Sequence, residues 1–267
     1  MIGSATNSFT TSPTSSRYKR QIAFTGLGQA GQQRLSASSA IIVGVGGLGS
    51  WASQLLARAG IGRLRLVDDD RVELVNLHRQ AYYTEPDAAA GVPKVQAAAK
   101  TIGRINSSVT VEPVTARLTA DNVASLADGC GVILDGTDNF ATRFVINDYG
   151  VRHGKPWIFA GVIAAEGQVM TILPGLSCCL RCLHDDVEPP GMTSQPPQAD
   201  PTAREVGVLG PAVATIAAIQ ASEALKLLTG QSALASPYLL KLNLWTNTIQ
   251  RLTPKPRPDC PCCGRRA

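Results

Sequence analysis

Residues 40–49 read Ala40-Ile41-Ile42-Val43-Gly44-Val45-Gly46-Gly47-Leu48-Gly49, an apolar run that leads directly into a glycine-rich turn. We expect a short buried strand, the turn, and a helix over residues 50–60. Three of the glycines match the pattern G-x-G-x-x-G, in which the first allows the turn, the second admits a phosphate and the third lets helix pack on strand. The N-terminus of such a helix favours an anion. The sequence therefore predicts a nucleotide site here, against the alternative of a purely structural turn.

Strands and helices alternate along the first 160 residues. We expect helices over 21–35, 91–105, 121–127 and 141–153, and strands over 63–67, 109–113, 131–134 and 157–160. This alternation predicts a Rossmann-like, doubly wound α/β sheet that is mainly parallel. After Gly161 the pattern predicts an exposed edge strand at 167–173, a buried helix at 210–228 and a hairpin of strands 239–244 and 248–252. Antiparallel strands should therefore extend the sheet.

Composition and charge exclude several function classes. The net charge is +5, from 25 Lys+Arg and 20 Asp+Glu. The sequence contains no basic stripe with interleaved aromatic residues, so it does not predict a nucleic-acid binder. The longest apolar run, 206–228, is interrupted by polar residues, which predicts a buried helix rather than a membrane span. Residues 1–16 are rich in Ser and Thr without an apolar core, so we expect a disordered tail, no signal peptide and a cytoplasmic protein. A single domain should span residues 17–267.

Charged residues follow the second expected strand. Asp68 lies about twenty residues after the glycine turn, where a ribose-binding carboxylate belongs. Arg79 and Lys94 would meet a polyphosphate if the intervening loop folds over the turn, because a guanidinium grips phosphate with two hydrogen bonds and an ammonium adds a point charge. The alternative is that these are surface charges on a solvated loop. We expect His78 to be packed or hydrogen-bonded rather than catalytic.

The sequence Asp135-Gly136-Thr137-Asp138-Asn139 follows the fourth expected strand, at the end where open α/β sheets bind ligands. Asp138 would hold Mg²⁺ between phosphates. The alternative is a turn in which an acidic residue caps the next helix. Asp135 fits that role as a cap or turn residue.

Seven cysteines include two C-x-x-C pairs, Cys179/Cys182 and Cys260/Cys263, about eighty residues apart in the chain. Two such pairs close a tetrahedral Cys₄ zinc site, which is structural because no position stays open for water. Disulfides or unrelated thiols are the alternative. Cys178 and Cys262 are spare thiols next to the pairs, and Cys130 is expected to be a buried core thiol.

These motifs occur in one order. They are Arg17-Tyr18-x-Arg20-Gln21, Gly44-x-Gly46-Gly47-Leu48-Gly49, Asp68-x-Asp70-x-Val72-x-x-x-Asn76-Leu77-x-Arg79-Gln80, Lys94, Asp135-x-Thr137-Asp138-Asn139, Gly207-Val208-Leu209-Gly210-Pro211 and the cysteine pairs. In this order they closely resemble the MoeB/ThiF/HesA family, bacterial relatives of ubiquitin-activating enzymes. The resemblance runs from about Arg17 to Gly264.

The resemblance implies an enzyme that uses ATP and Mg²⁺ to adenylate the C-terminal glycine of a small ubiquitin-like sulfur-carrier protein ending in Gly-Gly. It assigns the nucleotide to Gly44, Gly46, Gly47, Gly49, Asp68, Asp70, Asn76, Arg79, Gln80, Lys94, Asp138 and Asn139. It assigns catalysis to Arg20, Arg79, Lys94 and Asp138, with Arg20 contributed by the partner subunit of a homodimer. It also implies a crossover loop at about 184–206 and a C-terminal zinc-binding tail.

The crossover stretch departs from the family in one respect. Many members carry a cysteine just before the sequence Gly207-Val208-Leu209-Gly210, whereas residues 201–206 read Pro-Thr-Ala-Arg-Glu-Val. The resemblance therefore predicts adenylation without a covalent step on this loop. No sulfurtransferase-like sequence follows the cysteine tail, so we expect a separate sulfur donor.

Three other functions are weighed against this one. Adenylation of a peptide or small-molecule carboxylate in natural-product biosynthesis would use the same site. An NAD-dependent oxidoreductase would use the same glycine turn, but Arg79, Lys94 and Asp138 suit a triphosphate with Mg²⁺ better. A non-catalytic scaffold is disfavoured because these residues and Arg20 are all present.

Overall fold

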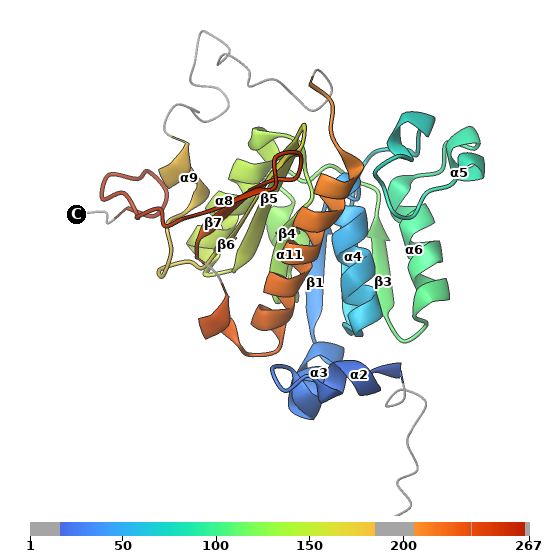
Figure 1. Ribbon diagram of the computed structural model, residues 1–267, viewed down its shortest axis with the longest axis horizontal. Coiled ribbons are helices and arrows are strands. Elements are labelled where there is room, and N and C mark those ends of the chain that lie inside the picture. Colours follow the sequence, from blue (N-terminus) through green and yellow to red (C-terminus); the bar gives the residue numbers. More distant parts are fainter. Residues whose placement is uncertain (1–16, 185–205, 236, 265–267) are drawn as a thin grey trace, which may run out of the picture.

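The structure, a computed structural model, describes residues 17–184, 206–235 and 237–264. The tail expected over 1–16 and most of the expected crossover loop lie outside these residues. The centre of the structure is an eight-stranded sheet with the strand order β3-β2-β1-β4-β5-β6-β7-β8 (Figure 1). The first five strands in this order are parallel and the last three are antiparallel, which confirms the mixed, mainly parallel sheet expected from the sequence.

The parallel half follows the alternation of strands and helices in the chain. Its elements are β1 (Ser39–Val43), α4 (Gly47–Ala59), β2 (Arg63–Val67), α6 (Lys94–Ile105), β3 (Thr110–Val114), α7 (Val123–Ala127), β4 (Val132–Asp135), α8 (Phe140–His153) and β5 (Trp157–Ile163). At the sheet edge, Glu112 of β3 pairs with Arg63 at 3.0 Å and with Arg65 at 2.8 Å. The strand order reverses between β1 and β4, so ligands are expected at the carboxyl ends of these two strands.

The antiparallel half consists of β6 (Glu166–Ile172), β7 (Leu239–Asn243) and β8 (Thr248–Leu252). The expectation of an exposed edge strand at 167–173 is wrong, because β6 lies between β5 and β7 and most of its residues are buried. The outer strand is β8, all of whose residues are exposed.

Helices cover both faces of the sheet. On one face α4 contacts both α11 (Gly210–Leu228) and α6, and α11 and α4 lie in front of the sheet in Figure 1. On the other face lie α7 and α8, with α9 (Leu180–Leu183) next to α8. Alternate residues of β1 feed the two cores, with Ile42 in the first and Ile41 in the second. Such alternation is what a strand with two covered faces requires.

Two helix boundaries differ from the expectation. The helix expected over 21–35 is two helices, α2 (Lys19–Ala23) and α3 (Gly28–Ser36), because the chain turns at Phe24, which is extended, and at Gly28, whose φ is +63°. The helix expected from residue 91 begins at Lys94, because Pro93 forms an isolated bridge with Arg71 and serves as the cap instead of entering the first turn. The short elements are η1 (Leu74–Asn76), α5 (Glu85–Ala89) and η2 (Ser232–Leu234).

The described helices include none long and apolar enough to cross a membrane. The apolar run expected to be a buried helix is α11, whose residues Val213, Ile216 and Ala217 lie in the core between α4 and the sheet.

Candidate active site

The glycine turn brings three backbone segments into close contact. Gly44 has a φ of +82° and donates its N–H to the carbonyl of Val67. A Cβ on Gly49 would lie 1.8 Å from the Gly44 carbonyl oxygen, and a Cβ on Gly136 would lie 2.2 Å from the same atom. These distances are too short for any side chain, so the first and third glycines of the motif, and Gly136 after β4, are required by packing of the turn itself.

Gly46 is different because little of the described part of the chain lies over it. The nearest atom to a Cβ at this position would be Nε2 of Gln80, at 3.6 Å. Gly47, by contrast, faces Val213 and the methylene groups of Arg79. Gly46 is also the N-cap of α4, with no side chain bonded to the free N–H groups of that helix end. The backbone at the start of α4 is therefore open to a ligand, and an anion is the ligand it favours.

Asp68 lies directly beside this turn and is buried. Its Oδ2 accepts the N–H of Val45 at 2.6 Å, and its Oδ1 accepts the N–H of Asp70 at 2.8 Å. Burial raises the pKa of Asp68, while the Lys94 charge and these two N–H groups oppose the rise. The carboxylate thus joins the glycine turn to the acidic segment after β2, at the position expected for a ribose ligand.

Lys94 begins α6 and is 5% exposed. Its Nζ forms an ion pair of 2.7 Å with Oδ2 of Asp70. Asp70 and Lys94, which the resemblance both assigns to the nucleotide, are therefore in contact. In this structure the carboxylate of Asp70 neutralises the ammonium of Lys94. A polyphosphate near Lys94 would compete with Asp70 for this charge.

The segment at 76–80 covers the turn from the side of η1. Asn76 accepts a hydrogen bond of 2.9 Å from Nε2 of Gln80, and both side chains are buried. Oε1 of Gln80 is buried and has no hydrogen-bond partner among the residues that the structure describes. The guanidinium of Arg79 contacts Nε2 of His78 at 2.8 Å and the Val75 carbonyl at 3.0 Å. His78 is therefore hydrogen-bonded, as expected.

The turn after β4 is organised by a buried ion pair that the sequence reading missed. Asp135 is fully buried, and its Oδ2 accepts a bond of 3.0 Å from Nε of Arg143 on α8. The same guanidinium donates to the carbonyls of Thr137 at 2.7 Å and Ala160 at 3.1 Å. Burial raises the pKa of Asp135, and Arg143 and Thr137 oppose the rise. Asp135 also accepts the N–H and the hydroxyl of Thr137, so it is a turn residue rather than the cap of α8.

Asp138 and Asn139, both assigned to the nucleotide, follow this turn and are exposed. Asn139 is the N-cap of α8, and its Oδ1 accepts the N–H of Thr142 at 2.9 Å. Asp138 sits one residue earlier and is exposed. The pairing of β1 with β4 continues into this region, since Gly136 donates its N–H to the Val43 carbonyl at 2.7 Å. Asp138 thus lies on the same edge of the sheet as the glycine turn.

Arg20 lies far from this edge within one chain. Its helix α2 packs at the C-terminal end of α4, where Gln21 donates to the Ala59 carbonyl at 2.8 Å. The glycine turn is at the N-terminal end of α4, and a helix of 13 residues is about 18 Å long. Figure 1 shows α2 and α3 at the opposite end of the strands from the start of α4. The same chain therefore does not bring Arg20 to the turn.

The four cysteines of the two C-x-x-C pairs converge, with all four sulfur atoms within 4.8 Å of one another. The Sγ–Sγ distances are 4.0 Å for Cys179–Cys182, 3.6 Å for Cys179–Cys260 and 3.3 Å for Cys182–Cys263. A tetrahedral zinc with bonds of about 2.3 Å needs sulfur atoms about 3.8 Å apart. The donor set fits zinc, and all seven cysteines are free of disulfides.

The spare thiols behave differently from the cluster. Cys178 is buried, which raises the pKa of its thiol to about 12, and burial likewise raises the pKa of Cys130. Both are core thiols. Cys262 accepts a bond of 3.3 Å from Nδ2 of Asn147 on α8. Oδ1 of the same fully buried asparagine accepts the Leu180 N–H at 2.8 Å, so Asn147 contacts both cysteine segments.

Comparisons with known proteins agree with this architecture. The crystal structure of E. coli MccB with ATP shares the fold, with a TM-score of 0.77, 22% identity and coverage of 93% of this chain and 74% of that one. The sulfur carrier protein ThiS adenylyltransferase of Bacillus subtilis is 36% identical over 93% of this chain and 71% of its own length. The sulfur carrier protein adenylyltransferase of Thermus thermophilus is 38% identical over 93% of this chain and 90% of its own length. A model of the ThiF family matches residues 18–262, and the chain therefore belongs to the ThiF family.

Proposed function

We propose that this protein is an ATP-dependent adenylyltransferase that activates the C-terminal glycine carboxylate of a small ubiquitin-like sulfur-carrier protein. The observation that carries the proposal is the open backbone at Gly46, at the N-terminus of α4, next to Gly47, whose Cβ position would contact the methylene groups of Arg79. This arrangement offers N–H groups and a cation to a phosphate at the switch point of the sheet. The two relatives named as sulfur-carrier adenylyltransferases give the substrate class.

The proposed roles follow from where the charges lie. Asp68 would bind the ribose, while Asn76, Arg79 and Lys94 would bind the triphosphate. Gln80 would hold Asn76 in place, because its amide already donates to that side chain. Asp138 would hold Mg²⁺, which neutralises charge on the phosphate oxygens when bound. Before ATP binds, Asp70 would pair with Lys94. On binding, a phosphate of ATP would replace Asp70 as the partner of Lys94.

The proposed reaction needs no nucleophile from the protein. An oxygen of the carrier's terminal carboxylate attacks the α-phosphorus of ATP, a new oxygen–phosphorus bond forms, and the bond to the bridging oxygen breaks. Pyrophosphate leaves with the electron pair, and an acyl-adenylate remains. Catalysis is then electrostatic, because cations gather where negative charge develops. A separate protein would supply the sulfur in the next step.

Arg20 would act from a second copy of the chain in a homodimer. The support is its distance from the glycine turn, about one length of α4, within its own chain. This predicts complementation: Arg20→Ala and Asp138→Ala are each inactive alone, and mixed subunits regain activity at one site of the heterodimer. Two variants that stay inactive after subunit exchange would refute the shared site.

The four clustered cysteines would hold a structural Zn²⁺. Burial alone would raise the pKa of Cys260, but N–H groups of Cys263 and Cys262 and the neighbouring thiols lower it to about 7. A low pKa supplies the thiolate that zinc binds. The remaining three thiols would lose their protons on binding the metal.

The decisive assay is exchange of labelled pyrophosphate into ATP that depends on a carrier protein ending in Gly-Gly. We expect exchange with the intact carrier and none after removal of its last glycine. Asp138→Ala should abolish it, whereas Asp121→Ala, an exposed acidic residue before α7, should leave it unchanged. Normal exchange in Asp138→Ala would refute the metal assignment. Exchange with a peptide or small acid but with no carrier would favour the alternative adenylation function, and tight NADH binding without ATP binding would favour an oxidoreductase.

A further inference from the structure

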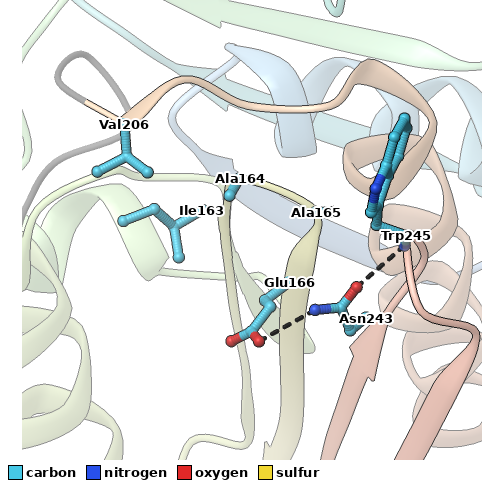
Figure 2. Close-up of a pocket in the computed structure, with 7 residues that line it drawn as sticks. All are labelled: Ile163, Ala164, Ala165, Glu166, Val206, Asn243 and Trp245. Carbon is cyan, nitrogen blue, oxygen red and sulfur yellow. Dashed lines mark hydrogen bonds between the residues drawn. The ribbon is translucent and has the colours of Figure 1, made fainter.

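A pocket of about 380 Å³ opens where β5, β6 and the β7–β8 hairpin meet the segment before α11. Its lining residues are Ile163, Ala164, Ala165, Glu166, Val206, Asn243 and Trp245 (Figure 2). Six of these are apolar or neutral, and Glu166 carries the one charge among them. The Trp245 ring is 79% exposed. An apolar wall with a single carboxylate suits a long side chain that ends in a cation.

The Glu166 carboxylate accepts a hydrogen bond from Asn243, a side chain that the backbone of the hairpin orients. Oδ1 of Asn243 accepts the N–H groups of Trp245 at 3.0 Å and of Thr246 at 3.1 Å. The orientation of the amide is therefore determined, and Nδ2 points to Oε1 of Glu166 at 3.1 Å. Figure 2 shows this chain from Trp245 through Asn243 to Glu166. The Asn243 amide thus orients the Glu166 carboxylate through one hydrogen bond.

The charge of Glu166 is not compensated within the described part of the chain. The ion pairs among residues 17–184, 206–235 and 237–264 include none that involves this carboxylate. Within the described residues, its one side-chain hydrogen bond comes from a neutral amide. A lysine or arginine of a ligand would pair with this carboxylate and would also contact the face of the Trp245 ring, which attracts cations.

The pocket lies a short, measurable length of chain from the nucleotide edge. Along β5, the carbonyl of Ala160 is bound by Arg143, the same residue that binds the turn carbonyl of Thr137. Ile163 is three residues further along the strand, which is about 10 Å. The pocket therefore begins about 10 Å along β5 from Ala160, which shares the Arg143 guanidinium with the turn that carries Asp138.

The segment before α11 gives a second measure of the same distance. Ala164 bonds to Gly207 at 2.9 Å and to Leu209 at 2.8 Å, so residues 206–209 run across the end of β5. Val206 lines the pocket, and a Cβ on Gly210 would lie 2.7 Å from the His78 carbonyl, next to Arg79. Four residues span at most about 14 Å. Both measures correspond to three or four residues of an extended peptide.

We infer that this pocket receives the side chain three or four residues before the carrier's terminal glycine, and that Glu166 selects lysine or arginine there. The inference rests on the proposed function, since it takes the terminal carboxylate to lie at the nucleotide edge. It makes Glu166 a specificity-determining residue. It also defines the substrate as a carrier with a basic residue just before its Gly-Gly end.

The test uses Bacillus subtilis ThiS carriers whose third and fourth residues before the terminal glycine are both lysine or both glutamate. In carrier-dependent pyrophosphate exchange, we expect the wild-type enzyme to have a KM roughly tenfold lower for the lysine carrier. Glu166→Lys should reverse this order with little change in kcat. Glu166→Gln, which keeps the acceptor for Asn243, should lose most of the preference. Asp121→Lys is the control, because it changes the net charge equally on an exposed residue outside the pocket.

Two results would overturn the inference: equal KM values for both carriers in the wild type, or the wild-type order kept in Glu166→Lys. Binding of the same carriers, followed by Trp245 fluorescence with Trp245→Phe as the blank, tests the pocket without catalysis. If no carrier supports exchange, the proposed function fails, and binding still decides the pocket. Stronger quenching of Trp245 by the lysine carrier than by the glutamate carrier would support the inference. Equal quenching by the two carriers would refute it.

Discussion

Arg143 is the residue whose loss should reveal most about the turn after β4. Its guanidinium bonds to Asp135 at 3.0 Å and to two backbone carbonyls, and it lies over the rings of Phe140 at 5.1 Å and Phe159 at 5.2 Å. Asp135 is completely buried, so no water replaces a lost partner. Arg143→Met keeps most of the apolar stem and removes the charge, leaving a buried carboxylate and two carbonyls without their donor.

The size of the effect follows from burial on both sides of the pair. Breaking a buried ion pair by removing one partner costs about 3–5 kcal/mol, because the other charge stays uncompensated. For a chain of this length, about 2–4 °C of melting temperature accompanies each kcal/mol, so a fall of roughly 10 °C is expected. The double change Asp135→Asn with Arg143→Met removes the stranded charge and should recover at least half of this loss.

Urea unfolding of the single and double variants measures these free energies directly. Arg152→Met is the matched control, since Arg152 is exposed on the same helix and should change the free energy of unfolding by less than about 0.5 kcal/mol. Arg143→Met should also weaken carrier-dependent exchange, because Thr137 and Asp138 lose their support. A loss below about 1 kcal/mol, or a double variant no more stable than the single one, would refute the argument that Arg143 compensates the buried Asp135 charge.

Three further changes test other parts of the molecule. The pKa of Glu112 is lowered because its two arginines outweigh its burial, so its stabilising effect is present at neutral pH and fades as pH falls through the folded pKa. Glu112→Gln should therefore cost about 1 kcal/mol of unfolding free energy at neutral pH, and the cost should decrease as the pH is lowered. Gly46→Ala should fold normally but raise the KM for ATP at least roughly tenfold, whereas Gly136→Ala should lower the melting temperature, because its Cβ would meet a backbone oxygen at 2.2 Å. The zinc content, measured by elemental mass spectrometry, should be one zinc ion per wild-type chain. It should be much lower in Cys263→Ser and unchanged in Cys130→Ala.

Much of the fold was predictable because strand and helix patterns are local. The run at 40–43, the glycine turn and the alternation up to residue 160 predicted the succession of strands and helices in the parallel half, since each buried strand is apolar on both faces. The edge strand was misplaced because alternation reports which faces are covered and carries no information about hydrogen-bonded neighbours. β6 alternates only at its start, and β7 pairs with it from about 70 residues away in the chain.

The candidate site was predictable where a single short motif contains the residues that the backbone conformation or the charge of the site requires. Gly44 and Gly49 follow from the turn alone. Arg143 was missed because an arginine eight residues after Asp135 looks like a surface residue of a helix, and only the tertiary structure buries it between two aromatic rings. Glu166 was missed for the opposite reason, because it is an exposed carboxylate whose setting depends on the hairpin that holds Asn243.

Helix α8 connects the two ends of the candidate site. Its first turn follows Asp138 and is anchored by Arg143, and its middle carries Asn147, which contacts both cysteine segments. Arg181, between two of the clustered cysteines, pairs with Asp148 on the same helix at 2.7 Å. A metal in the cysteine cluster would therefore brace the helix whose start carries the proposed Mg²⁺ ligand. Because the cluster is closed by four thiols, its effect on adenylation would come through the position of Asp138, so zinc loss should lower activity and stability together.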